Sequence, residues 1–66
     1  MKIYVNGQGQ ELPEGLSASG LIEQMGLSGR RLAMEVNEEI VPRSTFDQHV
    51  FAEGDRVEIV HAVGGG

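Results

Sequence analysis

The sequence predicts an α+β fold, in which one main helix packs on one face of a small mixed β-sheet. Short segments that alternate between apolar and polar side chains indicate strands, and one segment with helical period lies among them. The last alternating segment is apolar on both faces, which is typical of a strand in the middle of a sheet. The 66 residues allow one domain, residues 1–66, and a chain of this size buries only about 60% of its unfolded surface.

A β-hairpin is expected at the start of the chain. Residues 2–6 alternate between polar and apolar side chains and form its first strand. The dipeptide Asn6-Gly7 is typical of a type I′ turn, because both central residues of that turn need a positive φ. Residues 8–12 then form the return strand, and Pro13 ends it because proline has no N–H to donate.

A short amphipathic helix is expected at residues 18–25. Ser17 is a good N-cap residue, and Gly26 stands where a glycine commonly ends a helix, with Leu27 placed to pack back on the last turn. Gly20 weakens the helix by about 1 kcal/mol relative to alanine, so the helix should be stable only when docked on the sheet. Its apolar stripe has the spacing i, i+3, i+4, i+7 and consists of Ala18, Leu21, Ile22 and Met25.

Two more strands and a helical turn precede the last strand. Residues 31–36 alternate, a polar turn follows at 37–39, and 40–41 form a short strand. Residues 44–47 resemble a single helical turn capped by Ser44. Its expected buried anchors are Phe46 and Val50.

The last strand is expected at residues 57–62, after a turn at Gly54-Asp55. Alternation turns one set of side chains toward the helix and the other set toward the opposite face of the sheet. The first set is Val57, Ile59 and His61, and the second is Glu58, Val60 and Ala62. We predict that the second set binds a partner protein. The order hairpin, helix, strand, short strand, helical turn, strand is that of the ubiquitin-like β-grasp fold.

Composition excludes several classes of function. The net charge of −5 argues against nucleic acid as a partner, because such binding depends on Lys and Arg contacts to phosphate, and it favours a partner with a basic face. The absence of cysteine excludes disulfides and thiolate metal sites and agrees with a cytoplasmic location. No apolar segment has membrane-spanning length, and no signal-peptide pattern is found.

No set of residues predicts a catalytic or metal site. His49 and His61 have no metal-like spacing around them, and Ser17 and Ser44 are interpreted as helix caps. The two glycines within residues 7–12 fall in a hairpin and do not form a dinucleotide-binding loop. We therefore expect a protein that is not an enzyme and binds no cofactor of its own.

The C-terminal glycines, Gly64, Gly65 and Gly66, suggest a flexible tail that can enter a narrow slot in a partner, since glycine has no Cβ. The carboxylate of Gly66 then becomes the group with distinctive chemistry. Once adenylated, it would be an anhydride that a sulfur nucleophile can attack. The partner enzymes would have to supply both the base and the thiol.

The sequence resembles the sulfur carrier family of thiamine biosynthesis, ThiS, over essentially its whole length. The resemblance rests on residues 37–43 (Asn-Glu-Glu-Ile-Val-Pro-Arg), on Phe46, on Gly54-Asp55, and on residues 57–66. It implies that an E1-like adenylating enzyme of the ThiF type uses ATP to activate Gly66. It also implies that a sulfur donor converts the terminus to a thiocarboxylate, from which a thiazole synthase of the ThiG type takes the sulfur.

Two alternatives remain at this point. The small subunit of molybdopterin synthase is a similar carrier, but its members are usually longer and tend to have a Pro-Pro pair where this chain has His61-Ala62. A ubiquitin-like protein modifier is the second alternative. Lys2 is the single lysine, so lysine-linked chains of such a modifier would be poorly supported.

Overall fold

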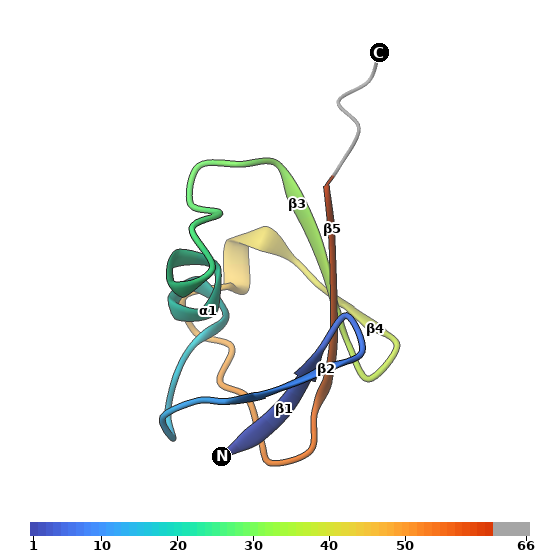
Figure 1. The fold of residues 1–66 in the computed structure, drawn as a ribbon. Coiled ribbons are helices and arrows are strands. Elements are labelled where there is room, and N and C mark those ends of the chain that lie inside the picture. Colours follow the sequence, from blue (N-terminus) through green and yellow to red (C-terminus); the bar gives the residue numbers. More distant parts are fainter. Residues whose placement is uncertain (62–66) are drawn as a thin grey trace.

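The computed structural model describes residues 1–61, in which five strands form one mixed sheet in the order β2-β1-β5-β3-β4 (Figure 1). Strands β1 and β5 are parallel, and the other neighbouring pairs are antiparallel. The last strand is central, as its apolar character on both faces predicted. The elements are β1 (Lys2–Val5), β2 (Gln8–Glu11), α1 (Ala18–Gln24), β3 (Leu32–Val36), β4 (Glu39–Val41), the 3₁₀ turn η1 (Arg43–Thr45) and β5 (Arg56–His61).

The first hairpin has the predicted type I′ geometry. Asn6 has a φ of 50° and Gly7 a φ of 84°, so both central residues of the turn are in the left-handed region. Strand β1 pairs with β2 in a register that places Val5 opposite Gln8. A two-residue turn of this type matches the twist of the strands that it joins, so it also sets their register.

Helix α1 begins and ends as predicted, although its last regular residue is Gln24 and not Met25. The Ser17 hydroxyl accepts a hydrogen bond from the Gly20 N–H at 3.1 Å. At the other end Gly26 has a φ of 73°, and the Leu27 N–H donates to the Ile22 carbonyl at 2.9 Å. The Gly26 N–H donates to the Glu23 carbonyl at 3.0 Å, which completes a Schellman motif.

Gly20 has a packing reason to be in the helix. A Cβ added to it would lie 2.6 Å from Cδ1 and 3.2 Å from Cγ of Leu16. Leu16 is half-buried and packs against the hydrophobic core. Glycine therefore lowers the helix propensity at this position, but the missing Cβ leaves space for the Leu16 side chain to pack over the first turn of the helix.

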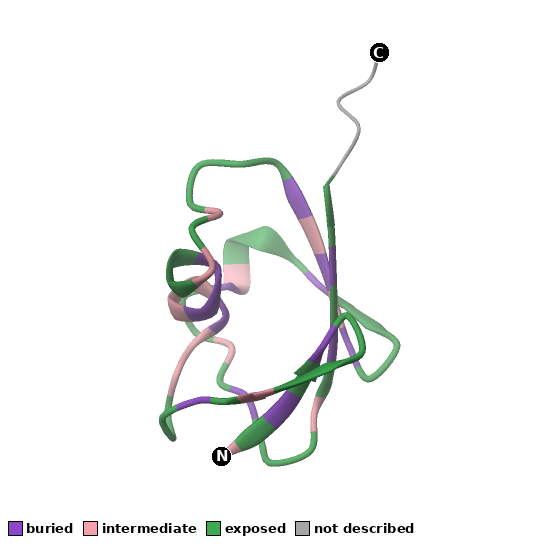
Figure 2. Ribbon diagram, in the orientation of Figure 1, coloured by how far each residue is buried: buried purple, intermediate pink, exposed green. Residues whose placement is uncertain are grey.

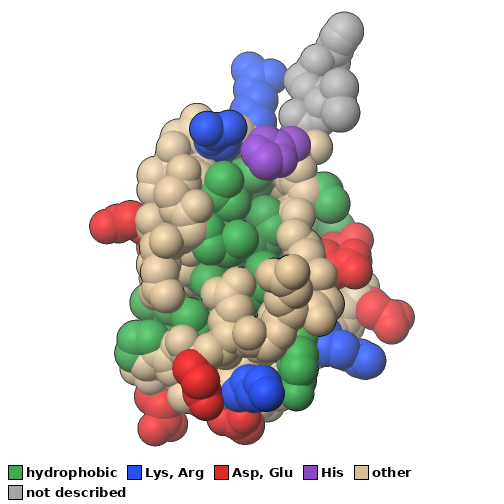
Figure 3. Space-filling view, viewed as in Figure 1, with side chains coloured by type: hydrophobic (Ala, Val, Ile, Leu, Met, Phe, Trp, Pro, Cys, Tyr) green, Lys and Arg blue, Asp and Glu red, His purple; other side chains and the backbone are tan. Residues whose placement is uncertain are grey.

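The core lies between α1 and the inner face of the sheet, and buried residues alternate with less buried ones along β1, β3 and β5 (Figure 2). On the side of the molecule seen in Figure 3, hydrophobic side chains gather in the middle and acidic side chains lie toward the edges. The buried residues include the inward side chains of β1 and β3, two of the three residues predicted to point inward from β5 (Val57 and Ile59, but not His61), and the stripe of α1, in which Met25 is only partly buried. They are Ile3, Val5, Leu12, Ala18, Leu21, Ile22, Leu32, Met34, Val36, Val41, Phe46, Phe51, Val57 and Ile59.

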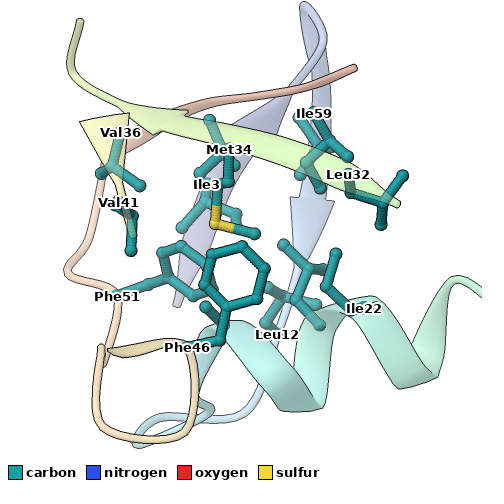
Figure 4. Packing of buried hydrophobic residues seen from close by; sticks show 14 residues of the cluster. Ile3, Leu12, Ile22, Leu32, Met34, Val36, Val41, Phe46, Phe51 and Ile59 are labelled. Carbon is teal, nitrogen blue, oxygen red and sulfur yellow. The ribbon is translucent and has the colours of Figure 1, made fainter. Parts of the chain in front are cut away.

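The segment after β4 differs from the prediction in two respects. The helical turn is a 3₁₀ turn whose N-cap position is Pro42, and no side chain caps it, so the expected cap by Ser44 is wrong. Phe46 is buried as predicted, but Val50 is 54% exposed and Phe51 takes the inner position (Figure 4). The isolated β-bridge between Ser17 and Val50 shows that the chain is already extended there.

Replacing Ile22 by alanine should lower the free energy of unfolding by about 2–5 kcal/mol, because it removes buried methyl groups and leaves a cavity. Ile22 is 7% exposed and lies on the face of α1 that meets the sheet. Glu23→Ala is the matched control, since Glu23 is exposed on the same helix and should change stability by less than about 0.5 kcal/mol. A denaturant melt in which Ile22→Ala also loses less than about 0.5 kcal/mol would show that this face of the helix is assigned wrongly.

Candidate functional site

The candidate site is centred on the last strand, β5, which ends at His61 beside the start of β3. His61 is exposed and pairs with Leu32 in the antiparallel ladder between these strands. The sequence predictions for Ala62 and for the glycine tail, Gly64, Gly65 and Gly66, lie outside the described residues.

The outer face of the sheet carries the predicted partner-binding residues. Glu58 is exposed and Val60 is 56% exposed, while Val57 and Ile59 between them are buried. The predicted alternation of β5 is therefore confirmed as far as Val60. His61, predicted to share the inner face, is exposed at the end of the strand.

Strand β3 adds two outward residues to this face, which were not among the predicted partner-binding residues. Ala33 lies opposite Val60, and Glu35 lies opposite Glu58. We call these four residues, Ala33, Glu35, Glu58 and Val60, the outer surface. They could not be grouped from the sequence, because the register between β3 and β5 joins residues more than twenty positions apart.

The outer surface carries a pair of like charges. Glu35 and Glu58 face each other directly across two neighbouring strands, an arrangement that is destabilising for like charges. Within residues 1–61 the one ion pair is formed by the N-terminal ammonium and Glu11, at 3.7 Å, so neither glutamate forms one, although Arg56 lines the same hollow as both of them. The surface therefore combines two facing carboxylates, with Arg56 nearby, and the exposed apolar side chain of Val60.

The start of β5 is held by a polar network around Asp55. The Asp55 carboxylate accepts hydrogen bonds from the Ala52 N–H at 2.8 Å and from Asn37 Nδ2 at 3.0 Å. Asn37 Oδ1 in turn accepts from the Arg56 N–H at 3.0 Å. The turn predicted at Gly54-Asp55 is present, with a φ of 84° at Gly54, and its aspartate is a structural residue.

The end of β5 is held by the side chain of Asn6. Its Oδ1 accepts a hydrogen bond from the Ile59 N–H at 2.9 Å, and its Nδ2 donates to the Ile59 carbonyl at 3.2 Å. The sequence indicated only that Asn6 begins a turn. Nothing in the pattern of residues showed that its amide would reach across the sheet.

Among residues 1–61, neither histidine belongs to a group of side chains that could bind a metal. His49 is half-buried, and its ring packs edge-on against Phe51 with centroids 5.4 Å apart and planes at 71°. In the part of the chain that the structure describes, no three His, Asp or Glu side chains gather closely enough to hold a metal ion. No helix of the described residues is long and apolar enough to span a bilayer.

Comparison with known proteins gives consistent results. The model of the ThiS family matches residues 3–66. The sulfur carrier protein ThiS of Escherichia coli is 30% identical over 66 residues, which cover all of both chains. The thiazole synthase of Paramagnetospirillum magneticum is 36% identical over the same 66 residues. This chain spans only 20% of that protein, and likewise 20% of the thiazole synthase of Magnetococcus marinus.

The fold has a close counterpart among solved structures. The crystal structure of the thiamine biosynthesis protein ThiS from Geobacter metallireducens superimposes with a TM-score of 0.85, at 29% identity and with full coverage of both chains. This likeness confirms the β-grasp fold predicted from the order of elements. The family match over nearly the whole sequence confirms the resemblance noted from residues 37–43 and 57–66. The chain belongs to the ThiS family.

Proposed function

We propose that this protein is a sulfur carrier that serves thiazole formation in thiamine biosynthesis. The family match carries the proposal, because it extends to residue 66 and so includes the glycines after β5. The end-to-end alignment with the carrier of Escherichia coli supports the same assignment. We also propose that the chain acts as a carrier and co-substrate, and that its partners provide catalysis, ATP and the sulfur donor.

The proposed chemistry takes place at the carboxylate of Gly66. In the first step a carboxylate oxygen bonds to the α-phosphorus of ATP and pyrophosphate leaves, which gives an acyl adenylate on an E1-like enzyme. In the second step a sulfide-equivalent nucleophile attacks the acyl carbon, and AMP leaves with the bridging oxygen. The product is a thiocarboxylate at Gly66. Gly64 and Gly65 would let the chain pass through a narrow slot to that point.

A thiazole synthase is the proposed acceptor of the sulfur. In two bacteria a protein of that name contains a segment that matches all 66 residues of this chain and fills a fifth of the longer protein. A carrier segment within the same polypeptide raises the local concentration of the carrier at the synthase. A separate chain of the same family would instead have to dock on its partner.

We propose that docking uses the outer surface together with Ala62. The pair Glu35–Glu58 is unfavourable in the free protein, and a basic group of a partner beside the two carboxylates would add to the attraction that Arg56, in the same hollow, already offers. The exposed Val60 beside this pair gives the partner an apolar contact next to the point where the tail begins. The net charge of −5 would add long-range attraction to a basic face.

Val60→Asp should weaken binding to the adenylating enzyme by at least about tenfold, which corresponds to about 1.4 kcal/mol, because it removes the apolar contact of Val60 and places a charged group, which is costly to desolvate, where the partner is apolar. The fold should be unaffected, since Val60 is 56% exposed. Val50→Asp is the control: it is the same substitution at a site that is 54% exposed and lies beside the start of α1. Equal affinities for the two variants in a calorimetric titration would contradict the assignment of the docking surface.

The intact mass of the protein isolated from its own host tests the proposed function. Replacement of one oxygen by sulfur at the C-terminal residue, located by fragmenting the intact chain, is the expected result. An attached second protein at the same residue would instead identify a ubiquitin-like modifier and overturn the proposal. The experiment thereby separates the carrier from that alternative.

A further inference from the structure

Strand β5 continues beyond the point where its parallel neighbour β1 leaves the sheet. The ladder between them contains the pairs Tyr4↔Arg56 and Val5↔Val57, and its last main-chain bond joins the Asn6 N–H to the Val57 carbonyl at 2.8 Å. At Asn6 the φ of 50° turns the chain away into the first hairpin. Beyond Val57, the edge of β5 that faces β1 has no further strand beside it in the described chain.

The side chain of Asn6 replaces the missing strand. In a regular parallel ladder, a residue donates its N–H to a carbonyl of the neighbouring strand. Its own carbonyl then accepts a hydrogen bond from the residue of that neighbouring strand that lies two positions after the first acceptor. Here the Ile59 N–H donates to Asn6 Oδ1 at 2.9 Å, because the main-chain carbonyl has turned away. Asn6 Nδ2 then donates to the Ile59 carbonyl at 3.2 Å. Both polar groups of the Ile59 peptide are thus bonded on this edge.

The second hairpin contains a comparable asparagine at the other end of β5. Asn37 has a φ of 52° and begins the turn between β3 and β4. Its N–H donates to the Arg56 carbonyl at 2.8 Å, and its Oδ1 accepts from the Arg56 N–H at 3.0 Å. Two asparagines with the same backbone conformation therefore hold the same strand, Asn37 at its beginning and Asn6 near its end.

We propose that Asn6 is a positioning residue for the reaction at the C-terminus, an inference that rests on the proposed carrier function. Ile59 lies between Glu58 and Val60 of the outer surface and two residues before His61, where the described chain ends. By binding Ile59, Asn6 therefore fixes Glu58 and Val60 of the outer surface in position relative to His61, after which the chain continues to the tail.

The length of the tail explains why that arrangement matters. The five residues that follow His61, Ala62 to Gly66, of which the last three are the glycine tail, span at most roughly 18 Å when fully extended. Once the outer surface is docked, the reacting carboxylate reaches the nucleotide only if the tail starts from the correct point and in the correct direction. A misplacement of about 1 Å can cost on the order of a hundredfold in rate.

Asn6→Gly and Asn37→Gly provide a matched test. Glycine accepts a positive φ readily, so each variant keeps its turn and loses only the side-chain bonds to β5. In pyrophosphate exchange with ATP and the adenylating enzyme, Asn6→Gly should lower kcat at least about tenfold while the KM for the carrier changes less than about twofold. Asn37→Gly should leave both constants within about twofold of wild type.

Amide hydrogen exchange supplies a second measurement on the free proteins. Asn6→Gly should speed exchange at Ile59 by about tenfold, because its N–H loses its acceptor, and Asn37→Gly should not. Asn6→Asp keeps an acceptor for the Ile59 N–H but no donor for the Ile59 carbonyl, so its kcat should lie between those of wild type and Asn6→Gly. Asn6→Asp decides the question if Asn6→Gly does not fold.

The possible failures are distinguishable. If wild-type protein supports exchange and the Asn6 variants have the kcat of wild type or of Asn37→Gly, Asn6 has no positioning role and the inference is overturned. If wild-type protein supports no exchange with its adenylating enzyme, the proposed carrier function itself fails, and the inference fails with it.

Discussion

Phe51→Ala is expected to lower the free energy of unfolding by about 3–5 kcal/mol, which is close to the whole stability of a domain of this size. Phe51 is 4% exposed, and its ring lies beside that of Phe46 between the sheet and α1 (Figure 4). The substitution would remove one of the two aromatic rings, those of Phe46 and Phe51, in the core described in residues 1–61. We expect the variant to be largely unfolded near 37 °C.

Val50→Ala is the control for that experiment. Val50 precedes Phe51 in the chain but is 54% exposed, so its truncation should change the free energy of unfolding by less than about 0.5 kcal/mol. Denaturant melts followed by circular dichroism measure both variants. Similar losses for the two substitutions would contradict the inner position of Phe51.

The sequence pattern predicted Val50 as a buried anchor, but the structure buries Phe51 instead. The difference shows that a pattern of spacing does not determine which residue of this segment is buried. Phe46 and Val50 have helical spacing, so a longer helical turn would bury both. The 3₁₀ turn ends at Thr45, however, and the carbonyls of Phe46 and His49 accept hydrogen bonds from the Ser19 and Ala18 N–H groups at 3.1 and 2.8 Å. The chain still turns through residues 46–48, with the His49 N–H bonded to the Thr45 carbonyl at 2.9 Å, but at Val50 it is extended and bridged to Ser17. Val50 therefore points outward and Phe51 becomes the buried residue.

The turn after β3 was also predicted imperfectly. Residues 37–39 were expected to form the turn, yet Glu39 already belongs to β4. The turn consists of Asn37 and Glu38, with φ values of 52° and 71°. A glutamate in the left-handed region is uncommon, and without a glycine at this position the sequence carried no signal for a two-residue type I′ turn.

The remaining elements were predictable because their signals are local. The dipeptide Asn6-Gly7, the cap at Ser17 and the glycine at Gly26 each act on residues within one turn of the chain. The outer surface depends instead on the register of β3 against β5. The hydrogen bond of the Ile59 N–H depends on the side chain of Asn6, which is 53 positions away in the sequence. Patterns within a single segment contain no information on such contacts.

Variants of the tail should have the largest effect on function. Deleting Gly66 shortens the reach of the tail by up to roughly 3.5 Å, and adding one alanine after Gly66 introduces a Cβ and an extra peptide unit. Both changes should nearly abolish thiocarboxylate formation, because the acyl carbon would no longer meet the α-phosphate within roughly 3–3.5 Å. Gly64→Ala should be milder, since Gly64 is furthest from the reacting carbon. The melting temperature should be nearly unchanged in all three variants, because the hydrophobic core described in residues 1–61 keeps all its side chains.

Pyrophosphate exchange with ATP and the cognate adenylating enzyme tests the central claim, that the carboxylate of Gly66 is the reacting group. The measurement compares wild type with the Gly66 deletion, the alanine extension and Gly64→Ala. The account predicts rapid exchange with wild type, a partial loss with Gly64→Ala, and almost none with the other two. Exchange at the wild-type rate with both the deletion and the extension would show that the terminus is not activated and would contradict the account.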